Sequence, residues 1–198
     1  MLFRSPDSVA GRAGVACLAC HATAHVDRSE GKMGAKALVR SDPLVLRGPH
    51  DVEPGVSPVH GTGPAAPHLT DGETICLACH ESTRNPKGVA ACTTGDEYAA
   101  RSGKQTCTDC HMPRVPGPSG AMSKRTDHAS HAFLGPHRAW HQGDVSFLAS
   151  AVEVGGELEA GTLTVRLKNV SSHAFPSGFP GRRAEVVVQG FDADGAPV

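Results

Sequence analysis

The sequence contains the pattern Cys-x-x-Cys-His three times, at residues 17–21, 76–80 and 107–111. This is the attachment pattern of c-type haem, in which two cysteine sulfurs bond to the porphyrin and the histidine binds the iron. Six of the seven cysteines lie inside these motifs. A covalent cofactor at three points constrains the fold more than any other feature, because the chain must hold, space and tune each group.

Zinc is the competing interpretation, because structural zinc sites also use Cys-x-x-Cys pairs. Zinc gives no reason for a histidine directly after the second cysteine in all three copies, since adjacent residues rarely point at one tetrahedral ion. A thioredoxin-like redox pair needs one such motif on a βαβ unit, not three. We therefore expect three haem c groups. The attachment cysteines are Cys17, Cys20, Cys76, Cys79, Cys107 and Cys110, and the proximal iron ligands are His21, His80 and His111.

Composition limits what else the chain can be. Its 198 residues suggest one or two small domains. The 19 basic and 20 acidic residues nearly cancel, so nucleic acid and anionic membrane surfaces are not expected partners. Aromatic residues make up 4% of the chain, while glycine and proline number 23 and 15. We expect a mostly irregular chain with short helices, in which buried porphyrins supply the apolar mass that side chains lack.

The expected compartment follows from the cofactor. The sequence has no apolar run long enough to span a bilayer, so no transmembrane segment is expected. Its amino end, residues 1–6, also lacks the apolar segment of a secretory signal. Because c-type haem is attached outside the cytoplasmic membrane, we expect a periplasmic or other extracytoplasmic location, with a leader that this sequence does not include.

Residues 1–140 carry all three motifs and 10 of the 12 histidines, and we expect them to form a triheme domain. Each motif is expected on a short helix. Thr70-x-x-Glu73 has the form of a capping box and predicts a helix over 71–81. Further helices are predicted over 13–26 and 104–111, with glycine- and proline-rich loops between them.

Residues 141–198 have a different pattern, which predicts a β-rich region. Residues 163–167 alternate and residues 184–188 are largely apolar, so both are expected to be strands. Periodicity does not decide between strand and helix for 147–154. We expect the opening of a small sandwich-like β structure. Two or three strands are only marginally stable alone, so we expect them to pack against the haem domain, another subunit or strands beyond Val198.

Two histidines have similar surroundings, in Ser130-His131-Ala132-Phe133-Leu134-Gly135 and in Asn169-x-x-x-His173-Ala174-Phe175-Pro176-Ser177-Gly178. Together with Cys110-His111-Met112-Pro113, these segments make the sequence resemble multihaem c-type cytochromes over nearly its whole length. The resemblance implies that His131 and His173 are distal iron ligands on loops. It also implies that Phe133, Phe175 and Pro176 pack beside the porphyrins.

The third distal ligand is less defined. The segment from Arg47 to His60 resembles the stretch that carries a ligand before the second attachment site in such cytochromes, and we favour His60 over His50. His25 is the main competitor. It follows His21 by four residues, so it would lie on the same helix face and could serve only another haem. The remaining histidines are expected to face solvent or to bind propionates: His68, His128, His137 and His141.

Methionine is the alternative sixth ligand and would raise the reduction potential. Met112 follows a proximal histidine directly, and Met33 and Met122 lie in glycine-rich loops, so bis-histidine ligation is favoured. The cationic side chains available to propionates are Arg114, Lys124, Arg125, Arg182 and Arg183. Cys92 lies outside the motifs and is expected either to pair between molecules or to be buried and inert.

The expected function is electron transfer through three closely packed, covalently bound haems, with no bound substrate. Redox proteins, a membrane electron-transfer complex or other copies of the chain are the expected partners. One alternative is a subunit or fragment of a multihaem oxidoreductase, which needs one haem with an open sixth position. Another is a protomer of a conducting cytochrome filament or larger complex, which would suit an unfinished sheet edge.

Overall fold

Short helices dominate the body of the molecule. The computed structural model describes residues 15–41, 43–53, 59–101, 105–121, 123–178 and 181–197. The α-helices in these ranges are α2 (Cys17–His21), α3 (Pro67–Thr70), α4 (Thr74–His80), α5 (Thr94–Ala99), α6 (Cys107–His111), α7 (Pro136–Gln142) and α8 (Ser146–Ala149). Two 3-10 turns are η1 (Ser29–Gly31) and η2 (Gly34–Lys36). No described helix could cross a membrane.

The strands form only two-stranded sheets within the described residues. The pairs are β1 (Thr23–Val26) with β2 (Leu38–Arg40), β3 (Val45–Leu46) with β4 (Gly61–Thr62), β5 (Thr83–Arg84) with β6 (Ala90–Cys92), β7 (Arg114–Pro116) with β8 (Asp127–Ala129), and β9 (Val152–Glu159) with β10 (Thr162–Asn169). The β3–β4 pair is parallel and the other four are antiparallel. No large sheet therefore organises the described chain.

The side-chain core is unusually small. The buried apolar residues among those described are Ala22, Ala37, Ala66 and Ala78, and the largest fully buried side chain is that of Thr23. Alanines cannot bury enough apolar surface to offset the entropy lost when a chain of this length is ordered. The fold therefore fits a protein whose interior is completed by bound apolar groups.

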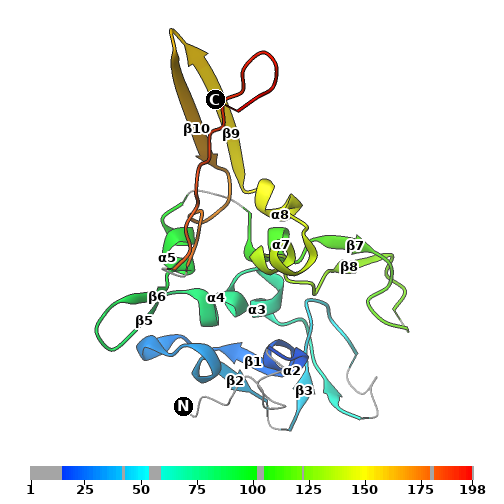
Figure 1. Cartoon of the computed structure of the whole chain (residues 1–198). Helices are drawn as coiled ribbons and strands as arrows, with labels where there is room; N and C mark the ends of the chain where they lie inside the picture. Colours follow the sequence, from blue (N-terminus) through cyan, green and yellow to red (C-terminus); the bar gives the residue numbers. More distant parts are fainter. Residues whose placement is uncertain are drawn as a thin grey trace.

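The carboxy-terminal region projects from the body as a long hairpin. Figure 1 shows β9 and β10 extending away from the short helices, with the last segment of the chain running beside them. The strand predicted over 163–167 is confirmed within β10, and residues 147–154 divide between α8 and β9. The strand predicted over 184–188 is wrong, because these residues run near the hairpin without joining its hydrogen-bond ladder. A hairpin, and no sandwich, is seen in the described part of this region.

The helix predicted over 71–81 is present as the shorter α4, but its predicted cap is wrong. The Thr70 hydroxyl donates to the Pro67 carbonyl (3.0 Å), so it is not available to α4. Asp71 Oδ1 instead accepts the backbone N–H groups of Glu73 (3.0 Å) and Thr74 (2.9 Å). The carboxylate of Asp71 therefore satisfies the first donors of this attachment helix.

The helix predicted over 13–26 is only half correct. Residue 13 lies outside the described residues, α2 ends at His21, and Thr23 begins β1, which pairs with β2. Partner strands thus override a weak local helical preference. The helix predicted over 104–111 is confirmed as α6 from Cys107 onward, and residue 104 is not described. Thr106 and Asp109 form a capping box at its start.

Candidate haem-attachment site

The three Cys-x-x-Cys-His motifs lie on α2, α4 and α6. A spacing of three residues places both cysteines of a motif on one face of its helix, with the histidine at the carboxyl end. All the described cysteines are free of disulfides, so every motif sulfur is available for a bond to a cofactor. No group of three or more His, Cys, Asp or Glu side chains in the described part converges on a bare metal ion.

The rings of His21 and His111 are oriented in the same way. His21 Nδ1 donates to the Arg47 carbonyl (2.6 Å), and His111 Nδ1 donates to the Leu134 carbonyl (2.5 Å). The backbone N–H groups of Arg47 and Leu134 return bonds to the carbonyls of the same histidines. A carbonyl can only accept, so Nδ1 carries the proton and Nε2 keeps the lone pair that a metal requires.

His80 has a different neighbour. Its Nδ1 lies 3.8 Å from the Sγ atom of Cys92, on β6. Burial lowers the pKa of His80, and the nearby His111 lowers it further. The neutral imidazole is therefore favoured, as iron ligation requires.

A second imidazole faces His21 and another faces His111. The ring centres of His21 and His131 are 6.2 Å apart with an interplanar angle of 34°, and those of His111 and His173 are 6.2 Å apart at 15°. A ligating nitrogen lies about 2 Å from its metal and its ring centre about 1 Å further, so imidazoles on opposite sides of one iron have centres about 6 Å apart. Both pairs have the spacing of two axial ligands, and these residues fit haem.

The two facing histidines are also held by local hydrogen bonds. His131 Nδ1 donates to the Ala129 carbonyl (3.1 Å) and His173 Nδ1 to the Ala174 carbonyl (2.8 Å). Asn169 Nδ2 and the Ser171 hydroxyl both donate to the His173 carbonyl. In both rings Nε2 is again the nitrogen left for a metal.

Aromatic side chains lie beside these rings. Phe133 lies edge-on to His131 with ring centres 6.0 Å apart, and its packing beside a porphyrin remains a prediction. Phe147 lies 5.3 Å from the ring of His111. Phe147 could not be predicted from the sequence, because nothing in the pattern of α8 links it to His111, 36 residues earlier. Packing of Phe175 and Pro176 beside a porphyrin remains a prediction.

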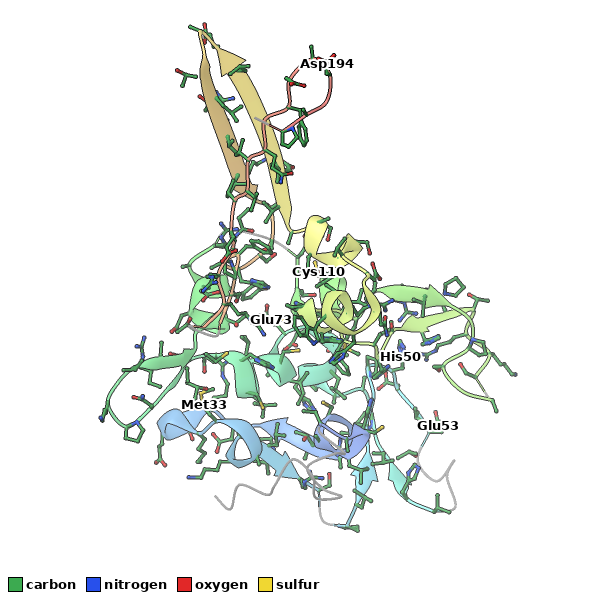
Figure 2. The ribbon with its side chains drawn as sticks, in the orientation of Figure 1. Met33, His50, Glu53, Glu73, Cys110 and Asp194 are labelled. Atoms are coloured by element: carbon green, nitrogen blue, oxygen red, sulfur yellow. The ribbon has the colours of Figure 1, made fainter. Side chains whose placement is uncertain are left out.

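The cysteines of α4 lie between those of α2 and α6. A hydrogen bond with Cys107 raises the pKa of Cys76, while burial and the charge of Cys79 raise the pKa of Cys20. Thr108 N–H on α6 also donates to the Gly72 carbonyl (3.1 Å), just before α4. Figure 2 shows Glu73 and Cys110, both half-buried, toward the middle of the body in this view. The attachment helices therefore converge, with α4 in the middle.

His68 differs from the expectation for the remaining histidines. It was predicted to face solvent or a propionate, but it is only 4% exposed, and burial lowers its pKa. It lies on α3, which packs against β1 and α4. Its Nε2 is buried without a hydrogen-bond partner among the described residues. His68 is therefore a buried neutral histidine of the core.

The other histidines outside the motifs are more exposed. His137 and His141 on α7 are exposed, and His128 is half-buried with its Nδ1 donating to the Gly117 carbonyl (3.0 Å). His60 Nδ1 donates to the Gly61 carbonyl (3.0 Å). Among the described residues no second imidazole faces His80, so the third distal place remains a prediction for His60, His25 or His50.

Several cationic side chains predicted for propionates already have partners. Arg114 pairs with Asp127 (2.6 Å) and Arg183 with Glu185 (2.7 Å). Lys124 and Arg125 line an open pocket with His50, which Figure 2 shows toward the edge of the body. Propionate binding by these groups stays a prediction, and Met122 is not among the described residues.

No family model matches the chain, and no curated protein matches it. A crystal structure is similar, that of a penta-heme cytochrome c552 from Thermochromatium tepidum, with a TM-score of 0.62 and 23% sequence identity. The likeness covers 92% of this chain and 50% of that chain, so the chain spans half the length of that protein. The architecture of short helices and small sheets is thus that of a multihaem cytochrome fold.

Proposed function

We propose that this chain binds three haem c groups covalently and transfers electrons through them. The observation that carries the proposal is the pairing of two motif histidines with a second imidazole at 6.2 Å. Haem supplies one-electron iron chemistry when bound, and the chain's own residues anchor it, ligate it and exclude water from it. The proposed anchors and proximal ligands are Cys17, Cys20 and His21, Cys76, Cys79 and His80, and Cys107, Cys110 and His111.

We propose His131 as the distal ligand opposite His21, and His173 as the distal ligand opposite His111. Both rings have Nδ1 engaged by a backbone carbonyl, which leaves Nε2 for iron. Two imidazoles from opposite sides predict low-spin iron and a lower potential than methionine ligation would give. The loop that carries His173 comes from the carboxy-terminal region, which would thereby complete a site built by residues 1–140.

The central place of α4 supports a middle position for the haem that would be attached there. The hydrogen bond from the Thr108 N–H on α6 to the Gly72 carbonyl before α4 (3.1 Å), and the raising of the Cys20 pKa by the charge of Cys79, support haems that lie close together around this helix. Redox partner proteins or a larger membrane-associated complex would exchange electrons with the outer haems. Covalent attachment of haem would take place outside the cytoplasmic membrane, so we propose an extracytoplasmic location.

A second candidate is a piece of a multihaem oxidoreductase. It is favoured by the absence of a facing imidazole at His80 among the described residues, since an open sixth position is what substrate binding would need. Carbon monoxide or cyanide distinguishes the two functions. A spectral change in the matured protein favours the oxidoreductase, and an unchanged low-spin spectrum favours the carrier.

Intact mass spectrometry of protein matured with a secretory leader and haem-attachment machinery tests the haem count. We expect the 20.5 kDa polypeptide plus three haems, with pigment that acidified acetone does not extract. A Cys76→Ala/Cys79→Ala variant should carry two. A colourless protein, or one whose pigment is extracted, contradicts the proposal.

A further inference from the structure

We propose that Cys92 tunes the reduction potential of the second haem by accepting the Nδ1–H of His80 at its sulfur. The inference rests on the proposed function, since it concerns the haem that His80 would ligate. It gives a role to the one cysteine outside the three motifs. Cys92 acts through His80 and is a positioning residue that does not itself bind iron.

The first step is a comparison of the three proximal histidines. His21 and His111 each donate Nδ1–H to a backbone carbonyl, at 2.6 and 2.5 Å. At His80 the neighbour of the same nitrogen is a thiol sulfur at 3.8 Å. Sulfur is a weaker acceptor than a carbonyl oxygen. The second haem is therefore the one whose proximal ligand has the weakest hydrogen bond.

The second step is the position of Cys92, which the backbone fixes. Cys92 is paired with Thr83 in the β5–β6 ladder. Just after it, Gly95 N–H donates to the Glu81 carbonyl (3.0 Å), beside His80. A Cβ at Gly95 would lie 2.5 Å from Glu81 Cα, so only glycine permits this approach. The strand pairing of Cys92 and the hydrogen bond just after it therefore hold the Cys92 sulfur next to the His80 ring.

The third step is the orientation of the thiol. Its remaining polar neighbours are the His80 carbonyl (4.0 Å) and the Thr94 hydroxyl (3.7 Å). Both can accept the S–H proton, which leaves a sulfur lone pair for the Nδ1–H of His80. The Thr94 hydroxyl also lies 3.1 Å from that of Ser177, near the loop that carries His173.

The electronic consequence follows from the role of such hydrogen bonds. An acceptor at Nδ1 makes the imidazole a stronger donor to iron, which stabilises the ferric state and lowers the potential. A weak acceptor lowers it less. Compared with a backbone carbonyl at the same position, the thiol of Cys92 should therefore give the second haem a higher potential.

The test is a redox titration of the matured triheme protein with two substitutions of opposite effect. Cys92→Ala removes the acceptor and should raise the potential of one haem, and Cys92→Asn offers an amide oxygen and should lower it. We expect a change of up to about tenfold in the ferric-to-ferrous ratio, which for one electron is about 59 mV. Ala91→Ser, at the exposed neighbouring position on β6, is the matched control and should leave all three potentials unchanged.

Haem methyl shifts in NMR spectra identify which haem moves. Unchanged potentials in both Cys92 variants, or a shift confined to the haem of another motif, would overturn the role of Cys92. Mass spectrometry first counts the haems in each protein. A wild type without three haems refutes the proposed function and is a separate failure. If Cys92→Ala fails to mature, the potential of the second haem in Cys92→Asn tests the role instead. A lower potential supports it, and an unchanged or higher potential contradicts it.

Discussion

At the scale of single residues, one hydrogen bond decides which nitrogen of each histidine is left for iron. The carbonyls of Arg47 and Leu134 hold the protons of His21 and His111 on Nδ1. The same arrangement recurs at His131 and His173, where the accepting carbonyls belong to residues close to the histidine in the sequence. Four imidazoles thus present Nε2 in pairs, which is the basis for assigning ligands from opposite sides.

Replacing a facing histidine should change the spin state of one haem. We expect His131→Ala and His173→Ala each to convert one haem to high spin, because the iron loses one of two strong axial ligands. Electron paramagnetic resonance and the visible spectrum measure this directly. His137→Ala, at an exposed position on α7, should leave the spectrum unchanged. A fully low-spin spectrum in either variant rejects that ligand.

Gly72 permits the close approach of α4 to α6. Its φ is +77°, and a Cβ there would lie 2.6 Å from Thr106 Oγ1 and 2.7 Å from Thr108 Oγ1. We expect Gly72→Ala to lower the free energy of unfolding by about 2 kcal/mol or more, from backbone strain together with overpacking. Denaturant titration of the matured protein measures the loss.

Gly88→Ala is the matched control for this substitution. Gly88 has a φ of +76° but nothing within 4 Å of the added Cβ, so it should cost about 1 kcal/mol from strain alone. Equal losses at the two positions would show that the contact with α6 contributes nothing.

At the scale of elements, α5 ties the carboxy-terminal region to the body. Glu97 accepts bonds from the Ser177 hydroxyl (2.7 Å), the Gly178 N–H (3.3 Å) and the Thr93 hydroxyl (2.8 Å). Ser177 is itself buried. The loop between β10 and these residues carries His173, so α5 positions a ligand that lies 76 residues away from Glu97 in the sequence.

Loss of the Glu97 carboxylate should loosen the third haem's distal ligand. Burial raises the pKa of Glu97, but the hydrogen bonds from Ser177, Thr93 and Gly178 outweigh it and lower the pKa below its usual value. A lowered folded-state pKa means that the stabilisation is complete above the unfolded pKa of about 4.3 and is lost as the pH falls through the folded value.

We therefore expect the wild type to become less stable and partly high-spin in acid below that range. Glu97→Gln should lose about 1 to 3 kcal/mol of stability at neutral pH and show less of this acid dependence. Spectra and unfolding measured between pH 3 and pH 7, as about the span of the transition, test this. Asp96→Asn, on the exposed face of α5, should behave like the wild type. A Glu97→Gln protein with an unaltered acid transition contradicts the role.

The sequence predicted local features of the site better than distant ones. The attachment helices could be predicted because each motif is a single turn with its ligands in a fixed order. Partnerships such as His21 with His131 join residues 110 apart, and only the family resemblance pointed to His131 and His173. The burial of His68, the strand at Thr23 and the unpaired segment 184–188 depend on which elements pack together, which periodicity does not encode.

At the scale of the whole molecule, the buried side chains form too small a core to stabilise the fold by themselves. Its buried apolar residues in the described part are alanines, whereas Leu158, Val187 and Phe191 are exposed. Three covalent porphyrins would add the missing apolar surface at the point where α2, α4 and α6 converge. Cofactor attachment and folding should therefore be coupled.

A chain without attachment cysteines should not fold cooperatively. We expect a variant with all six motif cysteines replaced by alanine to show poor NMR dispersion and no sharp unfolding transition, because the alanine core alone cannot offset the entropy of folding. The matured protein is the control and should unfold in one cooperative step. A sharp transition in the haem-free variant would show that the polypeptide supplies its own core.

The central position of α4 has a consequence for traffic along the molecule. With cofactors at all three motifs, the middle one becomes a relay through which every electron must hop between the two outer centres. Loss of the middle haem would leave two outer haems that no longer exchange electrons, so this haem would control the rate of electron transfer through the molecule.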